Sequence, residues 1–229
     1  MNKTEKLNFH YLGLASLFAA KKLNSYASLM GVYAEPIKGG GAHIVATDAK
    51  KMVLYYDRDA VLHEPILINV ASNKEFFTEG KKKPWTENPM IEFSRPEEWE
   101  AGNTINAKVH KPTGVLEYYL NTTDMKFPNY TKILPSEKNP VVEGPFGVSS
   151  AFMKEIYAVF PKTPTGKKET SSEKFKFVCL IKSSSDKSMV FVPATAKHDF
   201  LVMIMPAKIT DYHETPGWVL KLANKNGGA

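Results

Sequence analysis

The feature that most limits the fold is a recurring order, in which a segment with helical spacing precedes several short apolar runs of strand length. Residues 9–23 combine an apolar face with a basic end, and Asn8 stands before them as an N-cap. Residues 150–160 form a second such segment, which Pro161 ends. Strands joined by short turns pair antiparallel, so the pattern predicts an α+β fold of repeated helix-plus-antiparallel-strand units.

Each helical segment has its own group of expected strands. A short helix after Ser72, broken by Gly80 and Pro84, interrupts the first group, and residues 126–135 are too proline-bounded for regular structure. The expected strands are 28–36, 43–48, 51–57, 64–70, 90–94, 103–111 and 115–121 in the first group, and 176–182, 188–194 and 200–208 in the second.

Composition places few limits on function. The chain is 43% apolar and 24% charged, and its net charge of +6 is compatible with a polyanionic partner. A single cysteine, Cys179, excludes an internal disulfide and fits a reducing, cytoplasmic compartment. The N-terminal stretch loosely resembles a secretory signal, but its helical spacing favours an amphipathic helix. No apolar run approaches the roughly 20 residues of a membrane span, so we expect no membrane partner.

The sequence offers little catalytic chemistry. Its six histidines are scattered, and neither a nucleophile elbow nor a Walker loop is present, so we expect no enzyme, cofactor or metal site. Asp48 is expected to hold a turn rather than to act as a catalytic carboxylate, and Gly39–Gly41 to form a hairpin loop rather than a phosphate cradle. Tyr55 and Tyr56 are adjacent in an expected strand, so one side chain is predicted to face the core and the other the outside of the molecule. An unrecognised site acting on nucleic acid remains the alternative.

Three segments carry a resemblance to a known family. The stretch GVYAEPIKGGGAHIVATDAKKMVLYYD (31–57) resembles the middle domain of the bacterial DNA polymerase III beta sliding clamp, with its V-A-T-D-G-H-R-L turn. MKFPNYTKILP (125–135) resembles the family's segment between middle and last domains, and HDFLVMIMPAK (198–208) resembles its closing strand, which ends in V-M-P-M-R. The three lie in the family's order.

The resemblance implies a DNA-clamp-like fold of about three half-domain units. Residues 1–135 would correspond to the clamp's middle domain, 136–208 to half of its last domain, and 209–229 to a C-terminal extension. The family's first domain has no counterpart, as in truncated clamp-like proteins of phage and prophage genomes. A clamp ring contains twelve such units, so the resemblance implies a homo-oligomer.

In the clamp family these three segments form a hydrophobic pocket for short peptides of polymerases, loaders and other replication proteins. By position, the resemblance implies a pocket of Thr47, Lys51, Met52, Pro128, Lys132, Ile133, Met205, Pro206 and Ala207. These residues could instead close the core at a domain junction. The family's Gly-His-Arg is Ala49-Lys50-Lys51 here, and its Met-Pro-Met-Arg ends in Ala207-Lys208, so the pocket's shape would differ.

The family's helices line the inside of a ring around DNA. Lys21, Lys22 and Lys154 could contact duplex phosphates without reading sequence. The DNA-contacting tyrosines of the family correspond to Ala27 and Ser28, which favours the alternative of a clamp mimic or regulator that acts through proteins without encircling DNA. The apolar run GWVLKL in the C-terminal extension resembles the peptides that clamps bind, though an extra packed strand explains it equally.

Overall fold

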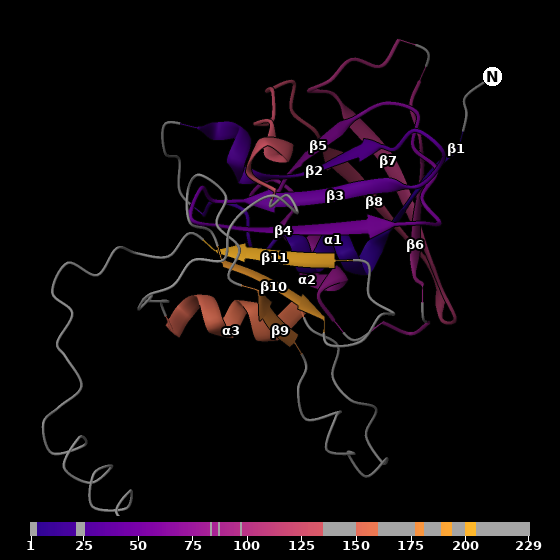
Figure 1. The fold of residues 1–229 in the computed structure, drawn as a ribbon. Helices are drawn as coiled ribbons and strands as arrows, with labels where there is room; N and C mark the ends of the chain where they lie inside the picture. Colours follow the sequence, from indigo (N-terminus) through magenta and orange to yellow (C-terminus); the bar gives the residue numbers. More distant parts are fainter. Residues whose placement is uncertain are drawn as a thin grey trace, which may run out of the picture.

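Two antiparallel sheets and a few short helices make up the fold of this computed structural model (Figure 1). It describes residues 4–21, 26–82, 84–86, 88–96, 98–134, 150–159, 177–180, 189–193 and 200–204. The four-stranded sheet has the order β1-β6-β7-β8, with β1 (Thr4–Asn8), β6 (Met90–Ser94), β7 (Thr104–Lys111) and β8 (Gly114–Asn121). The helices are α1 (Phe9–Ala15), α2 (Lys74–Gly80) and α3 (Ser150–Val159), with short 3-10 turns η1 (Ala27–Met30) and η2 (Tyr130–Ile133). The expected α+β class of helices and antiparallel strands is therefore confirmed.

The seven-stranded sheet joins distant parts of the chain. Its order is β5-β2-β3-β4-β11-β10-β9, and Figure 1 shows β3, β4 and β11 side by side. At the junction, Met203 of β11 pairs with Met52 of β4 in an antiparallel register. The bounds are β2 (Gly31–Pro36), β3 (Ala42–Thr47), β4 (Lys51–Asp57), β5 (Ile66–Asn69), β9 (Phe177–Leu180), β10 (Met189–Pro193) and β11 (Phe200–Ile204).

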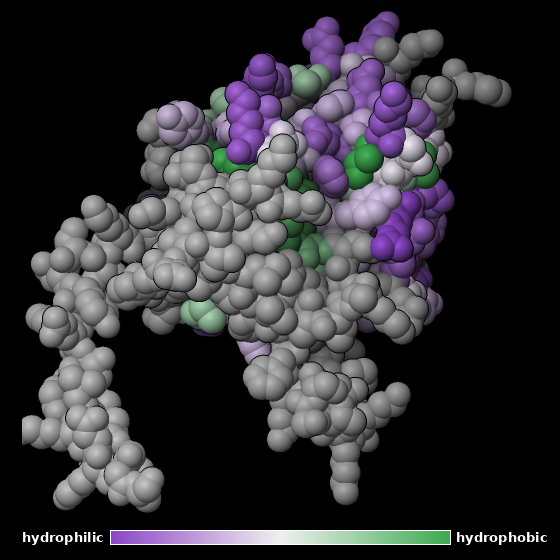
Figure 2. Space-filling view, viewed as in Figure 1, coloured by the Kyte–Doolittle hydropathy of each residue, from purple (hydrophilic) through white to green (hydrophobic). Residues whose placement is uncertain are grey.

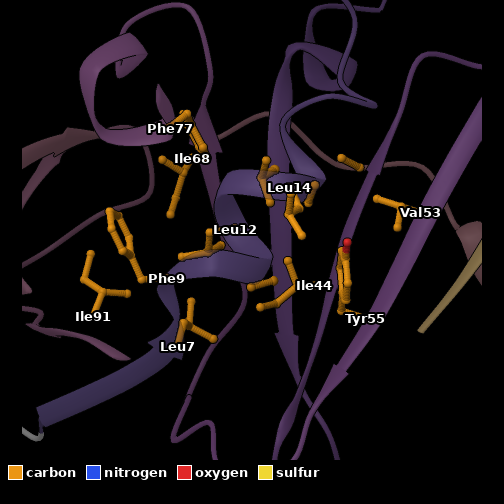
Figure 3. Packing of buried hydrophobic residues seen from close by; sticks show 14 of the residues in the cluster. Leu7, Phe9, Leu12, Leu14, Ile44, Val53, Tyr55, Ile68, Phe77 and Ile91 are labelled. Atoms are coloured by element: carbon orange, nitrogen blue, oxygen red, sulfur yellow. The ribbon is translucent and has the colours of Figure 1, made fainter. Parts of the chain in front are cut away.

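The main core lies between the two sheets. Helix α1 contacts strands of both sheets, and its Leu12 and Leu14 belong to the same core as Ile91 of one sheet and Tyr55 of the other (Figure 3). Tyr55 is buried and its neighbour Tyr56 is partly exposed, as the alternation predicts. No helix in the described part of the chain is long and apolar enough to cross a membrane.

Helices α1 and α2 approach each other through glycine. A Cβ atom added to Gly13 would lie 2.2 Å from the backbone carbon of Gly80, and one added to Gly80 would lie 2.8 Å from the carbonyl oxygen of Phe9. Only residues without a side chain permit this distance between the backbones. The two glycines therefore set how closely the helix pair fits between the sheets.

The hairpin between β3 and β4 has the turn chemistry expected from its sequence. The Asp48 carboxylate accepts hydrogen bonds of 3.0 Å from the backbone N–H groups of Lys50 and Lys51. Thr47 donates its hydroxyl to the Lys51 carbonyl at 2.8 Å, and Ala49 takes a positive φ of 70°. Asp48 therefore holds the turn, as predicted. Gly39–Gly41 likewise form the positive-φ loop between β2 and β3.

Two local predictions are wrong, and one strand was not expected. The strand predicted over 28–36 begins only at Gly31, because Ala27–Met30 form the 3-10 turn η1. The first helix ends at Ala15 instead of residue 23, because Leu17 and Phe18 donate to Leu14 and Ala15 in a tighter 3-10 geometry. This turn directs Phe18 into the core, where it is fully buried. The strand β1 was not expected, because its sequence, TEKLN, has only one large apolar residue.

Asp57 joins the end of β4 to the start of α1. Its carboxylate accepts a 2.6 Å hydrogen bond from the backbone N–H of Asn8, whose side chain in turn accepts from the N–H of Tyr11 and caps the helix. Burial raises the pKa of Asp57 to about 6, and the bond from Asn8 only partly opposes this effect. The folded chain therefore holds a proton on Asp57 at pH values where the unfolded chain does not.

This difference predicts a pH dependence of stability. Between about pH 4 and pH 6 the folded state binds more protons than the unfolded state, so the free energy of unfolding falls as the pH rises through this window. The Asp57→Asn variant lacks this titration. The free energy of unfolding of the native chain, relative to that of the variant, should therefore fall by as much as about 3 kcal/mol from low to neutral pH. Urea unfolding measures both values. A difference that is constant with pH would contradict the assignment.

Candidate peptide-binding surface

A second apolar cluster lies on the face of the seven-stranded sheet that points away from α1 and α2. Directly paired residues share a face, so Thr47, Met52 and Met203 all lie on this side. We call the following set the outer-face cluster: buried Val45, Met52, Leu54, Leu67, Phe127, Tyr130 and Met203, with partly buried Tyr33, Ile133, Leu134 and Leu201. It gathers side chains from five strands and from the segment that follows β8.

Residues 127–134 cross this face and complete the cluster. The Phe127 ring stacks on Tyr33 of β2, with 4.8 Å between centroids and an angle of 4° between planes. Asn129 starts the short η2 turn by accepting a 3.2 Å hydrogen bond from the N–H of Thr131. This turn directs Tyr130 and Ile133 onto the sheet.

A polar network fixes the same segment. Tyr130 donates its hydroxyl to the carboxylate of Glu35, and Tyr33 donates to the other oxygen of that carboxylate at 3.1 Å. Nδ1 of His43 lies 2.8 Å from the Tyr130 hydroxyl oxygen. Burial, followed by the Glu35 charge, raises the pKa of Tyr33 to about 12. Burial, followed by the hydrogen bond to Glu35, also raises the pKa of Tyr130, so both hydroxyls stay protonated donors. Burial also lowers the pKa of His43, which favours a neutral ring at pH 7.

The structure brings some of the predicted pocket residues together. Met52, 1% exposed, and Ile133 belong to the outer-face cluster, while Pro128 and Lys132 are exposed on the same segment. Thr47 shares the face, but its hydroxyl is engaged in the hairpin turn. Met205, Pro206 and Ala207 lie outside the described residues and follow the end of β11.

Lys51 points to the opposite face of the sheet, so its predicted place in the pocket wall needs correction. It is 4% exposed, and its Nζ donates to the Leu17 carbonyl at 2.8 Å and to the carboxylate of Glu155 on α3. The same ammonium lies 5.1 Å from the centre of the Phe18 ring. Because it is adjacent to Met52 in a strand, it must face the other way. Lys51 therefore binds α3 to the sheet.

This buried ion pair gives a prediction. Glu155→Ala removes the carboxylate nearest to the Lys51 ammonium and leaves only Asp48, whose Oδ2 lies 3.7 Å from Nζ, so it should lower the free energy of unfolding by about 3 kcal/mol. Lys51→Met removes the buried charge itself, so it should cost less. Urea unfolding of the two variants measures the order, and Lys154→Ala, an exposed neighbour on α3, serves as the control. A larger loss for Lys51→Met would contradict the ion-pair account.

The lysines proposed for DNA contact have different surroundings. Lys21 has a 75% exposed side chain, and its Nζ lies 3.3 Å from Glu155, the residue that also binds Lys51. Lys154 is exposed on α3, and Lys22 lies outside the described residues. Among the residues that are described, no group of three His, Cys, Asp or Glu side chains is placed to hold a metal ion.

Solved structures resemble this arrangement. The sequence matches no family model and no curated protein. The DNA polymerase III beta chain of Streptococcus pneumoniae matches 90% of this chain with a TM-score of 0.59 and 13% identity, and the beta subunit of Borrelia burgdorferi matches 90% with 0.58 and 15%. The DNA polymerase sliding clamp of Pseudomonas aeruginosa also has a TM-score of 0.59, at 12% identity over 90% of this chain.

This chain has the sliding-clamp fold. It spans 65% of the length of the Streptococcus clamp and 64% of that of the Borrelia clamp. At these identities the similarity establishes the fold, and function depends on the side chains described above. Several outer-face residues were missed by the sequence analysis, among them Phe127, Tyr33 and Met203. Met203 could have been found by strand alternation, because it is two residues from Met205, which the sequence analysis had placed in the pocket. Phe127 lies in a segment without regular periodicity.

Proposed function

We propose that this chain is a sliding-clamp-like binding module that holds a linear peptide of a replication protein against the outer-face cluster. The observation that carries the proposal is the meeting of β4, β11 and residues 127–134 on one face. The resemblance assigns the peptide pocket of the beta clamp to these same three segments. Polymerase and loader proteins with clamp-binding peptides are therefore the proposed partners.

The chemistry of the cluster suits an apolar peptide. Buried Met52, Met203 and Phe127 form the floor of the surface, where methionine side chains can adapt their packing. The partly buried Tyr33, Ile133, Leu134 and Leu201 are the apolar side chains that a peptide could contact. Exposed Lys132 stands beside the cluster, where it could pair with an acidic group of the peptide. The Tyr130–Glu35 hydrogen bond holds the 127–134 segment in place, so this wall would be formed before a peptide arrives.

Peptide binding tests the proposal directly. Ile133→Ala removes a partly buried apolar side chain worth about 1–2 kcal/mol and should weaken a fluorescent clamp-binding peptide of a polymerase about tenfold, measured by anisotropy. Met125→Ala, a 48% exposed apolar residue just before the segment, serves as the matched control and should bind normally. Equal binding by both variants, or no saturable binding by the native chain, would contradict the proposal.

The order of elements supports a division of the chain. The units α2-β6-β7-β8 and α3-β9-β10-β11 each place one helix before three antiparallel strands. We therefore propose one clamp-like domain in residues 1–135, a half domain in 136–208 and an extension in 209–229. About four copies would supply the twelve units of a ring.

A second candidate function is a regulator that binds proteins without encircling DNA. The observation that favours it is the charge of the helices, which the resemblance would place towards DNA. Helix α1 carries no lysine, arginine or carboxylate, and α2 and α3 together carry two lysines and three glutamates, a net charge of −1. Phosphate binding depends on an excess of basic side chains.

Retention on circular DNA separates the two candidates. The regulator predicts that the chain elutes from nicked circular duplex as fast as from linear duplex at physiological salt, while the polymerase peptide still binds. Retention that is lost when the circle is cut would instead demonstrate encirclement. In that case Lys21→Glu and Lys154→Glu should each weaken retention in a salt-dependent manner.

A further inference from the structure

The outer-face cluster leaves several apolar side chains open to solvent. Tyr33, Ile133, Leu134 and Leu201 pack on its buried residues but are themselves only partly buried. Figure 2 shows hydrophobic patches, drawn in green, between hydrophilic side chains on the side of the molecule where β3 and β4 lie in front of α1. Apolar surface that stays in contact with water is a place where a further apolar segment can be buried. This holds whether that segment belongs to a partner or to the chain itself.

The chain has a segment of matching chemistry in its own sequence. Residues 217–222, GWVLKL, lie outside the described residues and include Trp218, Leu220 and Leu222, with Lys221 as the only charge. Side chains two positions apart lie on the same side of an extended chain, so these three would form one apolar edge. Tryptophan is also among the residues that most often dominate the energy of an interface. The run GWVLKL is therefore suited to pack, in extended form, on an apolar surface.

Strand β11 ties this run to the outer-face cluster. Met203 belongs to the cluster, β11 ends at the next residue, Ile204, and residues 205–216 join that end to the run. The twelve residues of this tether reach at most about 40 Å when fully extended. The cluster spans β5, β2, β3, β4 and β11, which at about 4.8 Å between neighbouring strands is a width of about 20 Å. The tether is therefore long enough for the run to reach any part of the cluster.

Charges favour the same encounter. The segment that crosses the outer face has exposed Lys126 and Lys132, with no acidic residue between them. The stretch just before the apolar run, residues 209–216, contains Asp211 and Glu214 and neither lysine nor arginine. Opposite charges at the rim of an interface speed the encounter and help to fix its register. The acidic stretch and the apolar run together therefore match the basic rim and the apolar centre of this surface.

We infer that the run GWVLKL docks on the outer-face cluster of its own chain and controls the access of partner peptides to it. The inference rests on the proposed function, because it assigns a regulator to the same surface. Docking within one chain is favoured over docking on a second copy, since a short tether gives the run an effective concentration on the order of 1 mM. A polymerase peptide then has to displace the run, so a weak partner is rejected and a strong one binds.

A peptide with the sequence of the tail tests the inference. The probe is a fluorescent peptide of residues 211–224, and the receiving protein is the full chain with Trp218→Ala and Leu220→Ala, which we call the double variant. Anisotropy should show saturable binding to the double variant with a Kd of about 0.1 mM. The native chain should bind the peptide about tenfold more weakly, because an effective concentration of about 1 mM keeps about nine-tenths of its surfaces occupied. Asn224→Ala, in the same extension, serves as the control and should behave like the native chain.

The contact surface requires its own variants. In the double variant, adding Ile133→Ala should weaken binding of the 211–224 peptide about tenfold, and adding Met125→Ala should leave its affinity unchanged. A peptide in which asparagine and glutamine replace Asp211 and Glu214 should bind severalfold more weakly at low salt. Salt at about 0.5 M should remove this difference, because it screens charges at the rim.

The polymerase peptide separates this inference from the proposed function. If both hold, the double variant should bind that peptide about tenfold more tightly than the native chain does. Equal affinities would overturn the inference and leave the proposed function standing. Binding of the 211–224 peptide without any binding of the polymerase peptide would support docking of the run and contradict the proposed function.

Three further results would overturn the inference outright. They are the absence of saturable binding of the 211–224 peptide to the double variant, binding that Ile133→Ala does not weaken, and a double variant that no longer melts cooperatively, since the run would then belong to the core. An oligomer of the native chain that the double variant does not form in sedimentation would also overturn it, because a second copy would then supply the run.

Discussion

The pairing of β4 with β11, together with the buried Lys51–Glu155 ion pair, is the interaction on which the rest of the structure depends. It turns two separate groups of strands into one seven-stranded sheet and brings α3 beside it. On one side of this junction the sheet covers the core around α1, and on the other it carries Met52 and Met203. The candidate site therefore receives Leu201 and Met203 only because the two parts of the chain share a sheet.

Much of the fold follows from local sequence. The short apolar run in KMVLYYD was sufficient to predict β4 residue for residue. Asp48 and Asn8 likewise predicted the turn and the helix cap that they form. The division of this strand between two faces was also predictable, since it needs only the period of two. These features depend on neighbours close in the sequence, which is why they could be read without a structure.

The rest depends on distant partners. The Lys51 ammonium lies 3.7 Å from Asp48 in its own hairpin, but its nearest carboxylate belongs to Glu155 on α3, more than one hundred residues away in the sequence. Likewise the Tyr130 hydroxyl is held by Glu35 and His43, in strands that precede it by about ninety residues. Resemblance to the clamp family indicated the segments that meet, but it placed the Lys51 side chain on the wrong face.

The β4–β11 junction also has a consequence for the order of events in folding. Met52 and Met203 are 151 positions apart, so closing this contact carries the entropy of a long loop and comes late. During synthesis, the edge of β4 that pairs with β11 stays unpaired until β11 has been synthesised. An unpaired apolar strand edge can pair with the wrong strand. The chain is therefore most exposed to misassembly, and most in need of chaperones, before β11 pairs with β4.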